Sequence, residues 1–138
     1  MQVYFGFTVA GDRSTLDTAH RMVQVLESRC HVVLTRHLVD EDARQQDRLL
    51  KPEEVYERDM RWLAQADIFI AEVSGSSFGL GYEAGYVLGA TEKRAVLFYR
   101  TSAAARISLL ILGNTHPHCT LLPYHDDDEV AAWLTAHF

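Results

Sequence analysis

The chain contains little cysteine or proline and no long apolar run. Its two cysteines, Cys30 and Cys119, are too few for the disulfide framework of a small secreted domain, so we expect a reducing, cytoplasmic environment. Its apolar runs, such as those at 68–71 and 109–112, are far shorter than the roughly 18 residues of a membrane-spanning helix. The first residues also lack the basic and apolar regions of a secretory signal. We therefore expect no association with a membrane.

Basic residues are outnumbered as well. Lys and Arg total 13 against 19 Asp and Glu, which gives a formal charge of −6. This balance argues against broad binding of nucleic acid, but it does not exclude one small anion held in a local pocket. With 138 residues, of which 48% are hydrophobic, the chain is large enough to bury a core. Because no linker or repeat divides it, we expect a single domain over residues 1–138.

Apolar runs and helix-like patterns alternate along the chain. The expected strands lie at 3–7, 31–34, 68–73, 95–99 and, more weakly, 121–122, and the expected helices at 16–26, 52–66, 79–91, 106–112 and 129–138. Alternation of this kind predicts an α/β fold, a doubly wound (Rossmann/flavodoxin-like) five-stranded parallel sheet with helices on both faces. Ligands of such sheets bind beyond the carboxyl ends of strands, here the loops after Phe7 and Val73.

Local patterns add three smaller expectations. Ser14 and Asp17 are spaced like a capping box at the start of the first helix. The polar stretch at 36–51 has no periodicity and is expected to be a mobile loop. Cys30 has no motif around it and is expected to be a small buried side chain.

Asp59 interrupts the apolar stripe of the helix at 52–66. Val55, Trp62, Leu63 and Ala66 recur at helical spacing, and Asp59 occupies the remaining position of that series. A carboxylate on a buried stripe must be paired or must face a pocket, because an isolated buried charge is very costly. Asp59 is therefore either a functional carboxylate or a structural one that caps a neighbouring loop.

A glycine-rich stretch follows the apolar run at 68–73. It reads Gly79-Leu80-Gly81-Tyr82-Glu83-Ala84-Gly85, and its spacing differs from the dinucleotide-binding fingerprint. A glycine-rich turn that opens a helix can bind phosphate through free backbone N–H groups. Glu83 is expected to remain ionised near the positive end of the helix dipole, unless it is only an ordinary acidic residue at a helix start.

Two carboxylates at one end of a crevice are typical of glycosidic chemistry, in which one is the nucleophile and the other assists the leaving group. Tyr4 on the first strand could orient the nucleophile, although a plain core tyrosine is an equal alternative. His116 and His118 lie beside Cys119, but no second cluster accompanies them, so we expect no metal site.

Taken together, three parts of the chain resemble one family. Tyr4, the stretch at 59–67 with its Asp-x-x-Trp-Leu motif, and the stretch at 71–85 with Ser-x-Gly-x-Gly-Tyr-Glu resemble the 2'-deoxynucleoside 5'-monophosphate N-hydrolases. These are the Rcl proteins of the nucleoside 2-deoxyribosyltransferase superfamily, and the resemblance covers residues 2 to about 113. It implies that Glu83 forms a covalent deoxyribosyl intermediate, that Asp59 assists departure of the base, and that Tyr4 lies beside the nucleophile. It implies no cofactor.

The same resemblance implies the residues that bind the substrate. Ser77 binds the 5'-phosphate together with the helix start at Gly79 and Gly81, and His37 lies near the base. Ser108 reaches the phosphate from the neighbouring subunit of a homodimer, a match that requires a one-residue insertion.

Two positions depart from or refine the family pattern. Relatives often carry a basic residue where this chain has Ala10, and Arg13 is expected to replace its contact with the phosphate. Related deoxyribosyltransferases carry an aspartate where this chain has Ser77. A hydroxyl can donate to a phosphate that a carboxylate would repel, so we expect a nucleotide substrate. The alternatives are a deoxyribosyltransferase and a non-catalytic nucleotide-binding module.

Overall fold

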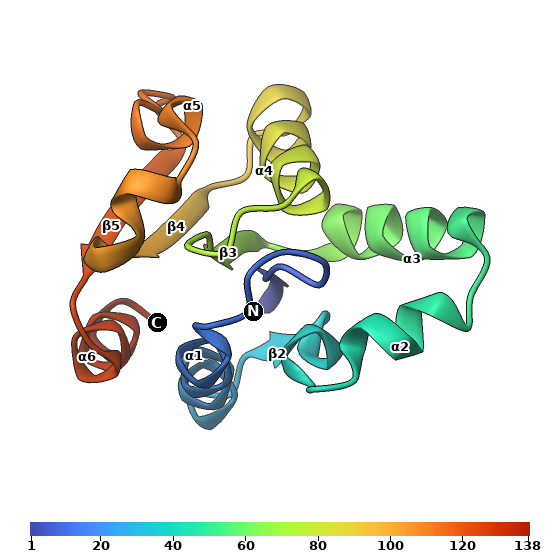
Figure 1. The fold of residues 1–138 in the computed structure, drawn as a ribbon, viewed down its shortest axis with the longest axis horizontal. Helices are drawn as coiled ribbons and strands as arrows, with labels where there is room; N and C mark the ends of the chain where they lie inside the picture. The colour runs from blue at the N-terminus through green and yellow to red at the C-terminus, as the bar shows by residue number, and fades with distance from the viewer.

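The computed structural model describes residues 1–138 and has a sheet of five parallel strands at its centre (Figure 1). The strands lie in the order β2-β1-β3-β4-β5. Their bounds are β1 Gln2–Gly6, β2 Val32–Val33, β3 Ile68–Glu72, β4 Ala95–Arg100 and β5 Cys119–Tyr124. The chain moves outward from β1 in both directions, so strand order reverses between β1 and β3. The predicted doubly wound α/β fold is confirmed.

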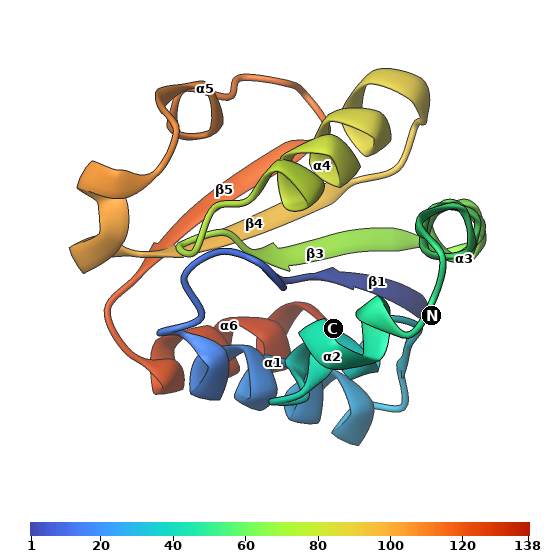
Figure 2. The same cartoon turned by 45° about the vertical axis from the view of Figure 1, so that its right-hand side comes forward.

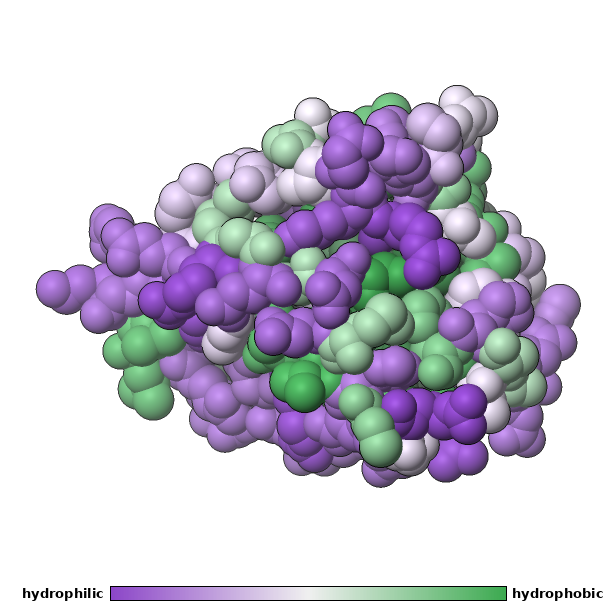
Figure 3. Space-filling view, turned by 180° about the vertical axis from the view of Figure 1, so that it is seen from behind, coloured by the Kyte–Doolittle hydropathy of each residue, from purple (hydrophilic) through white to green (hydrophobic).

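Helices cover both faces of this sheet (Figure 2). Helices α1 (Leu16–Ser28) and α6 (Asp127–His137) enclose one hydrophobic cluster, and α3 (Pro52–Gln65) and α4 (Phe78–Ala90) enclose a second cluster on the other face. The remaining short helices are η1 (Arg36–Val39), α2 (Ala43–Arg48), η2 (Thr101–Arg106) and α5 (Leu109–Leu112). None of the helices combines the length and the apolar character that crossing a bilayer requires. Seen from behind, most of the surface is hydrophilic, and hydrophobic side chains form small patches (Figure 3).

The stretch at 36–51 is not the loop that the sequence predicts. It forms η1 and α2, and it buries Leu38, Val39 and Ala43. Three buried side chains spread over two short helices give no repeat that a periodicity argument could detect. The segment is therefore docked on the body of the protein.

The predicted capping box at Ser14 is also wrong. Helix α1 is preceded by Thr15, which makes no side-chain cap. The backbone N–H of Ser14 instead donates to Asp12 Oδ1 at 2.9 Å, and the Thr15 hydroxyl donates to Glu72 Oε2 at 2.6 Å. A tertiary contact at the sheet edge has replaced the local cap.

Glu72 ties together the loops at the carboxyl edge of the sheet. It is fully buried and accepts hydrogen bonds from the hydroxyls of Thr15, Ser74 and Tyr124 and from the backbone N–H of Ser74. Burial raises the pKa of Glu72, while these bonds oppose the shift. The loop that leads from β3 to α4 is thereby fixed to α1 and β5.

The same loop is pressed against the loop after β1. A Cβ added to Gly75 would lie 1.9 Å from the carbonyl oxygen of Asp12, and one added to Gly11 would lie 2.3 Å from that of Gly75. Only glycine permits two backbones to approach this closely. The two loops at the reversal of strand order therefore form one rigid edge.

Cys30 is exposed, not buried, and it adopts a left-handed backbone conformation with φ of 62°. It follows the end of α1, where the N–H of Cys30 donates to the carbonyl of Glu27 and the N–H of His31 donates to that of Leu26. This pair of bonds is the Schellman motif, which usually places glycine at this position.

We predict that Cys30→Gly stabilises the protein by about 0.5–1 kcal/mol, because glycine removes the steric cost of the left-handed conformation. Chemical denaturation would measure the change. Arg29→Gly, one residue earlier at φ of −92°, is the matched control and should destabilise by a similar amount. Equal effects of the two substitutions would contradict the prediction.

Candidate active site

The centre of the site is a hydrogen bond between Tyr4 and Glu83. Tyr4 on β1 is fully buried, and its hydroxyl donates to Glu83 Oε1 on α4 at 2.7 Å, joining residues 79 positions apart. The other oxygen, Oε2, receives no hydrogen bond from the chain. The structure thus gives Tyr4 the orienting contact expected of it and leaves one oxygen of Glu83 free to react.

Glu83 is not held in its ionised form as the helix-dipole argument predicts. It lies in the second turn of α4, beyond the first turn where the dipole acts, and burial raises its pKa to about 7. The negative charges of Asp59 and Asp47 raise this pKa further, whereas the Tyr4 hydrogen bond and the charge of Arg58 lower it. At neutral pH the carboxyl group is therefore close to half ionised.

Asp59 belongs to the same group of side chains, as the break in the apolar stripe predicts. Its Oδ1 accepts a hydrogen bond from Arg58 Nε at 2.8 Å, and Arg58 Nη1 donates to Asp47 Oδ1 of α2 at 3.0 Å. The Arg58 guanidinium lies over the Trp62 ring, 5.1 Å from its centroid. Asp59 is thus paired with a cation at the edge of the site while its Oδ2 accepts no hydrogen bond from the chain.

Sequence reasoning missed Arg58 and Asp47. Arg58 directly precedes Asp59, but nothing in the local pattern shows that its side chain folds back onto Asp59. Asp47 lies in the stretch for which no structure was expected. A basic residue beside the anomalous aspartate was the only available signal.

His37 of η1 lies beside this group. Its ring packs against Trp62 with the centroids 5.5 Å apart, and its Nε2 is 3.8 Å from Asp47 Oδ1, too far for a hydrogen bond. Desolvation and the nearby charge of Arg58 lower the pKa of His37, so the imidazole is mainly neutral at pH 7. Contact of His37 with the base of a substrate remains a prediction.

Ser77 caps the start of α4. Its Oγ accepts a hydrogen bond from the backbone N–H of Leu80 at 3.4 Å, which leaves the hydroxyl hydrogen available to a ligand. Gly79 and Gly81 lie inside α4 and no glycine has a positive φ, so the glycine-rich stretch is part of a helix and not a turn. Free N–H groups are limited to the first turn, which includes Gly79.

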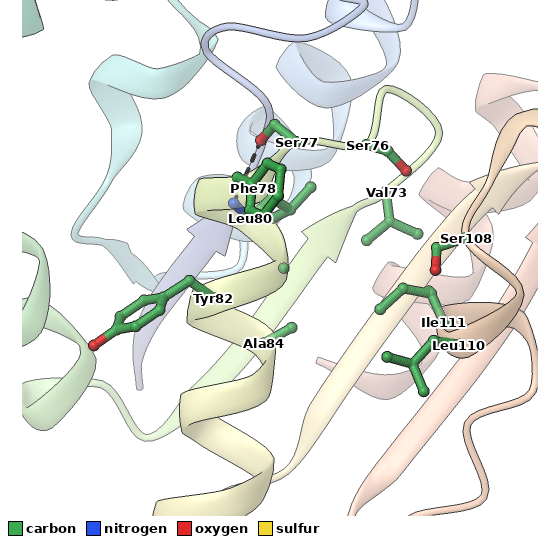
Figure 4. Close-up of a pocket in the computed structure, with 11 residues that line it drawn as sticks. Val73, Ser76, Ser77, Phe78, Leu80, Tyr82, Ala84, Ser108, Leu110 and Ile111 are labelled. Atoms are coloured by element: carbon green, nitrogen blue, oxygen red, sulfur yellow. Dashed lines mark hydrogen bonds between the residues drawn. The ribbon is translucent and has the colours of Figure 1, made fainter.

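A cleft of about 670 Å³ opens on the other side of α4, between that helix and α5 (Figure 4). Ser77 and Ser108 both line it, together with apolar side chains that include Leu110 and Ile111. Glu83 is not among the lining residues, although it belongs to the same helix. Ser77 at the helix start therefore adjoins this cleft as well as the helix that bears Glu83.

Arg13 has a different role from the phosphate contact expected of it. Its guanidinium donates to the backbone carbonyls of Thr8 at 2.7 Å, Asp40 at 2.8 Å and Leu38 at 3.0 Å, and it lies over the ring of Phe7. Three of its five N–H groups are therefore used within the chain. Arg13 clamps the loop after β1 to η1, and this geometry does not favour a phosphate ligand.

The histidines near the carboxyl end are simple neighbours. The rings of His116 and His118 lie 5.5 Å apart. The structure contains no group of three or more His, Cys, Asp or Glu side chains arranged to hold a metal ion.

Comparisons with known proteins show the family of the chain and its fold. A family model described as nucleoside 2-deoxyribosyltransferase matches residues 3–117. The chain is 39% identical to a Thermofilum pendens protein provisionally named 2'-deoxynucleoside 5'-phosphate N-hydrolase 1, over 94% of this chain and 89% of that protein. It is 32% identical to the human 5-hydroxymethyl-dUMP N-hydrolase, over 99% of this chain and 78% of that protein. The solved structure of the Clostridium botulinum CMP N-glycosidase BcmB shares the fold, with a TM-score of 0.73, 18% identity and full coverage of both chains.

We predict that Glu83→Gln stabilises the folded protein at alkaline pH. Because the folded-state pKa is raised, the wild-type protein loses stability as pH rises through about 7, whereas glutamine remains neutral. The difference in free energy of unfolding should approach about 3 kcal/mol at pH 8–9 and vanish near pH 4. Denaturation at several pH values measures it, with Glu57→Gln on the exposed face of α3 as the control. A difference that does not vary with pH would contradict the assigned burial of the charge.

Proposed function

The chain belongs to the nucleoside 2-deoxyribosyltransferase family, and we propose that it hydrolyses the N-glycosidic bond of 2'-deoxynucleoside 5'-monophosphates. The products are the free base and 2-deoxyribose 5-phosphate. The names of its relatives supply the bond and the nucleotide class. The observation that carries the proposal is the partly buried Tyr4–Glu83 hydrogen bond, which orients a carboxylate with one free oxygen next to Asp59.

In the first step, Oε2 of ionised Glu83 attacks C1' of the sugar. The bond between C1' and the base nitrogen breaks, and its electron pair leaves with the base. Asp59 assists this departure by passing a proton from Oδ2 to the base, and is left as a carboxylate. A deoxyribosyl ester of Glu83 results, in which the attacking oxygen has lost its negative charge by bonding to C1'.

In the second step, water attacks C1' from the face that the base has left. Its proton passes to Asp59, the ester bond breaks, and Glu83 is released as a carboxylate. In a ribonucleotide, the hydroxyl at C2' withdraws electrons and destabilises the positive charge that develops at C1'. A 2'-deoxy sugar lacks this hydroxyl, so deoxynucleotides should react faster than ribonucleotides.

The phosphate binds at the start of α4. The Ser77 hydroxyl and the first-turn N–H groups supply donors there, and the positive end of a 13-residue helix favours an anion. No acidic side chain is present at position 77 to repel the phosphate. This arrangement favours a nucleotide over a nucleoside.

The nearest alternative is transfer of deoxyribose to a second base, which shares the covalent intermediate and differs only in what resolves it. We predict that incubation with a deoxynucleoside monophosphate and a different free base yields free sugar phosphate and no new nucleotide. Glu83→Ala should lower base release by several orders of magnitude, because it removes the nucleophile. Chromatography of the products formed from a panel of deoxy- and ribonucleotides and nucleosides measures free sugar phosphate, any new nucleotide and the rate of base release.

Each alternative outcome of that panel identifies a different activity. A new nucleotide would make the protein a transferase. Saturable binding without any base release would make it a binding module. Near-normal release by Glu83→Ala would remove the nucleophilic mechanism.

We further propose that the active form is a homodimer, formed through the cleft between α4 and α5. Phe78 is 100% exposed, and Leu109 and Leu110 are 84% and 83% exposed. An apolar surface of this kind is typical of an interface. In such a dimer Ser108, exposed at the start of α5, is placed to reach the phosphate bound by the partner.

Helix α4 supports the same proposal through its glycines. Gly81, Gly85 and Gly89 recur every four residues, and a Cβ added to any of them would meet nothing within 4 Å. Each glycine costs a helix about 1 kcal/mol relative to alanine, so packing within one chain does not explain the stripe. Close approach of a second copy does.

Leu110→Glu should convert the dimer to a monomer, because it places a charge in the apolar contact. Analytical ultracentrifugation measures the change, and the equally exposed Leu49→Glu on the far side of the protein should leave the dimer intact. Wild-type protein that sediments as a monomer at micromolar concentration would contradict this proposal.

A further inference from the structure

Arg58 connects two acidic side chains, Asp59 of its own helix α3 and Asp47 of α2. Its Nε donates to Asp59 Oδ1 at 2.8 Å and its Nη1 donates to Asp47 Oδ1 at 3.0 Å. The guanidinium plane lies against Trp62, and only 15% of the side chain is exposed. Fixed by two carboxylates and one aromatic ring, the guanidinium has a single orientation.

The first consequence concerns Asp59. Because Arg58 occupies Oδ1, Oδ2 is the oxygen that remains for the departing base. The planar guanidinium directs Nε at Asp59 and Nη1 at Asp47, so the contact with Asp47 fixes the direction from which Nε reaches Oδ1 of Asp59. Without Arg58 the Asp59 side chain could rotate and exchange its two oxygens.

The second consequence concerns Glu83. Four groups from three elements act on it: Tyr4 from β1, Asp59 and Arg58 from α3, and Asp47 from α2. Arg58 is the only cation among them, and it opposes the two aspartates. Its charge therefore favours a third anion, ionised Glu83, in a site that already holds two aspartates.

We propose that Arg58 is a positioning residue of this site: it directs Oδ2 of Asp59 toward the leaving base and favours the ionised, nucleophilic form of Glu83. Asp47 accepts a hydrogen bond from Arg58 and holds it in place. Through this contact α2 influences the reaction without touching the substrate. This inference rests on the proposed hydrolysis and extends it to a residue that does not touch the reacting atoms.

The experiment separates the two effects with two substitutions. Arg58→Lys keeps the charge but loses the planar group whose two donors reach Asp59 and Asp47, and Arg58→Gln loses both the charge and this group. Arg61→Gln, on the exposed side of the same helix, is the matched control for loss of a positive charge. For each protein, kcat and KM for a deoxynucleoside monophosphate and the pH profile of kcat/KM are measured, after circular dichroism has verified the fold.

In the wild-type protein kcat/KM should rise with pH through a midpoint near 7, because Glu83 must be ionised to attack. Both Arg58 variants should lose about 10- to 100-fold in kcat with little change in KM, since a misdirected group slows the reaction without weakening phosphate binding. Only Arg58→Gln should move the midpoint upward, by about half to one pH unit. Arg61→Gln should change neither quantity.

Two results would overturn the inference: full kcat in Arg58→Lys, or an unmoved midpoint in Arg58→Gln. If Arg58→Gln does not fold, kcat of Arg58→Lys alone decides. Glu83→Ala, measured beside them, distinguishes the two levels of the argument. Loss of activity in Glu83→Ala with normal Arg58 variants rejects the positioning role only, whereas an active Glu83→Ala rejects the proposed reaction itself.

Discussion

The burial of Glu83 against Tyr4 is the constraint on which the site depends. A carboxylate on the inner side of α4 is costly unless a donor meets it, and the only donor that reaches it is the hydroxyl of a fully buried tyrosine on β1. Tyr4 cannot move, because its ring stacks on Phe69 of the adjacent strand with the centroids 5.6 Å apart. The central strands thus determine where one oxygen of Glu83 lies, and the other oxygen is left to a substrate.

A second buried carboxylate, Glu72, has a purely structural role and can be compared with Glu83. Glu72 and Glu83 both have pKa values raised by burial. Glu72 accepts four hydrogen bonds that engage both of its oxygens, and it holds loops together. Glu83 accepts only one, so its remaining capacity has no structural use. The difference in hydrogen bonding, and not the difference in pKa, separates the structural carboxylate from the reactive one.

The fold and both carboxylates could be predicted from the sequence because each leaves a local signal. Parallel strands are apolar on both faces, Asp59 breaks an apolar stripe, and Glu83 lies within a recognisable motif. Properties set by distant contacts left no such signal. The pKa of Glu83 follows from burial, and the Arg58–Asp47 pair joins α3 to α2, which lies in a stretch with no periodicity. The exposure of Cys30 was not predicted, because a left-handed residue at the end of a helix is usually recognised in a sequence as a glycine.

Helix α4 joins the chemistry to the outer surface of the molecule. One side carries Glu83 toward α3, the other carries the glycine stripe and borders the cleft with α5, and Ser77 caps the end common to both. A helix with four glycines is intrinsically weak, so its position must come from contacts at its ends and sides. Within the chain those contacts are the Ser77 cap, the buried Leu80, Ala84 and Val87, and the Tyr4 hydrogen bond. A partner packed along the glycine stripe would restrain the remaining side, and would thereby fix the distance between the proposed phosphate site at Ser77 and the proposed nucleophile, Glu83, in the second turn.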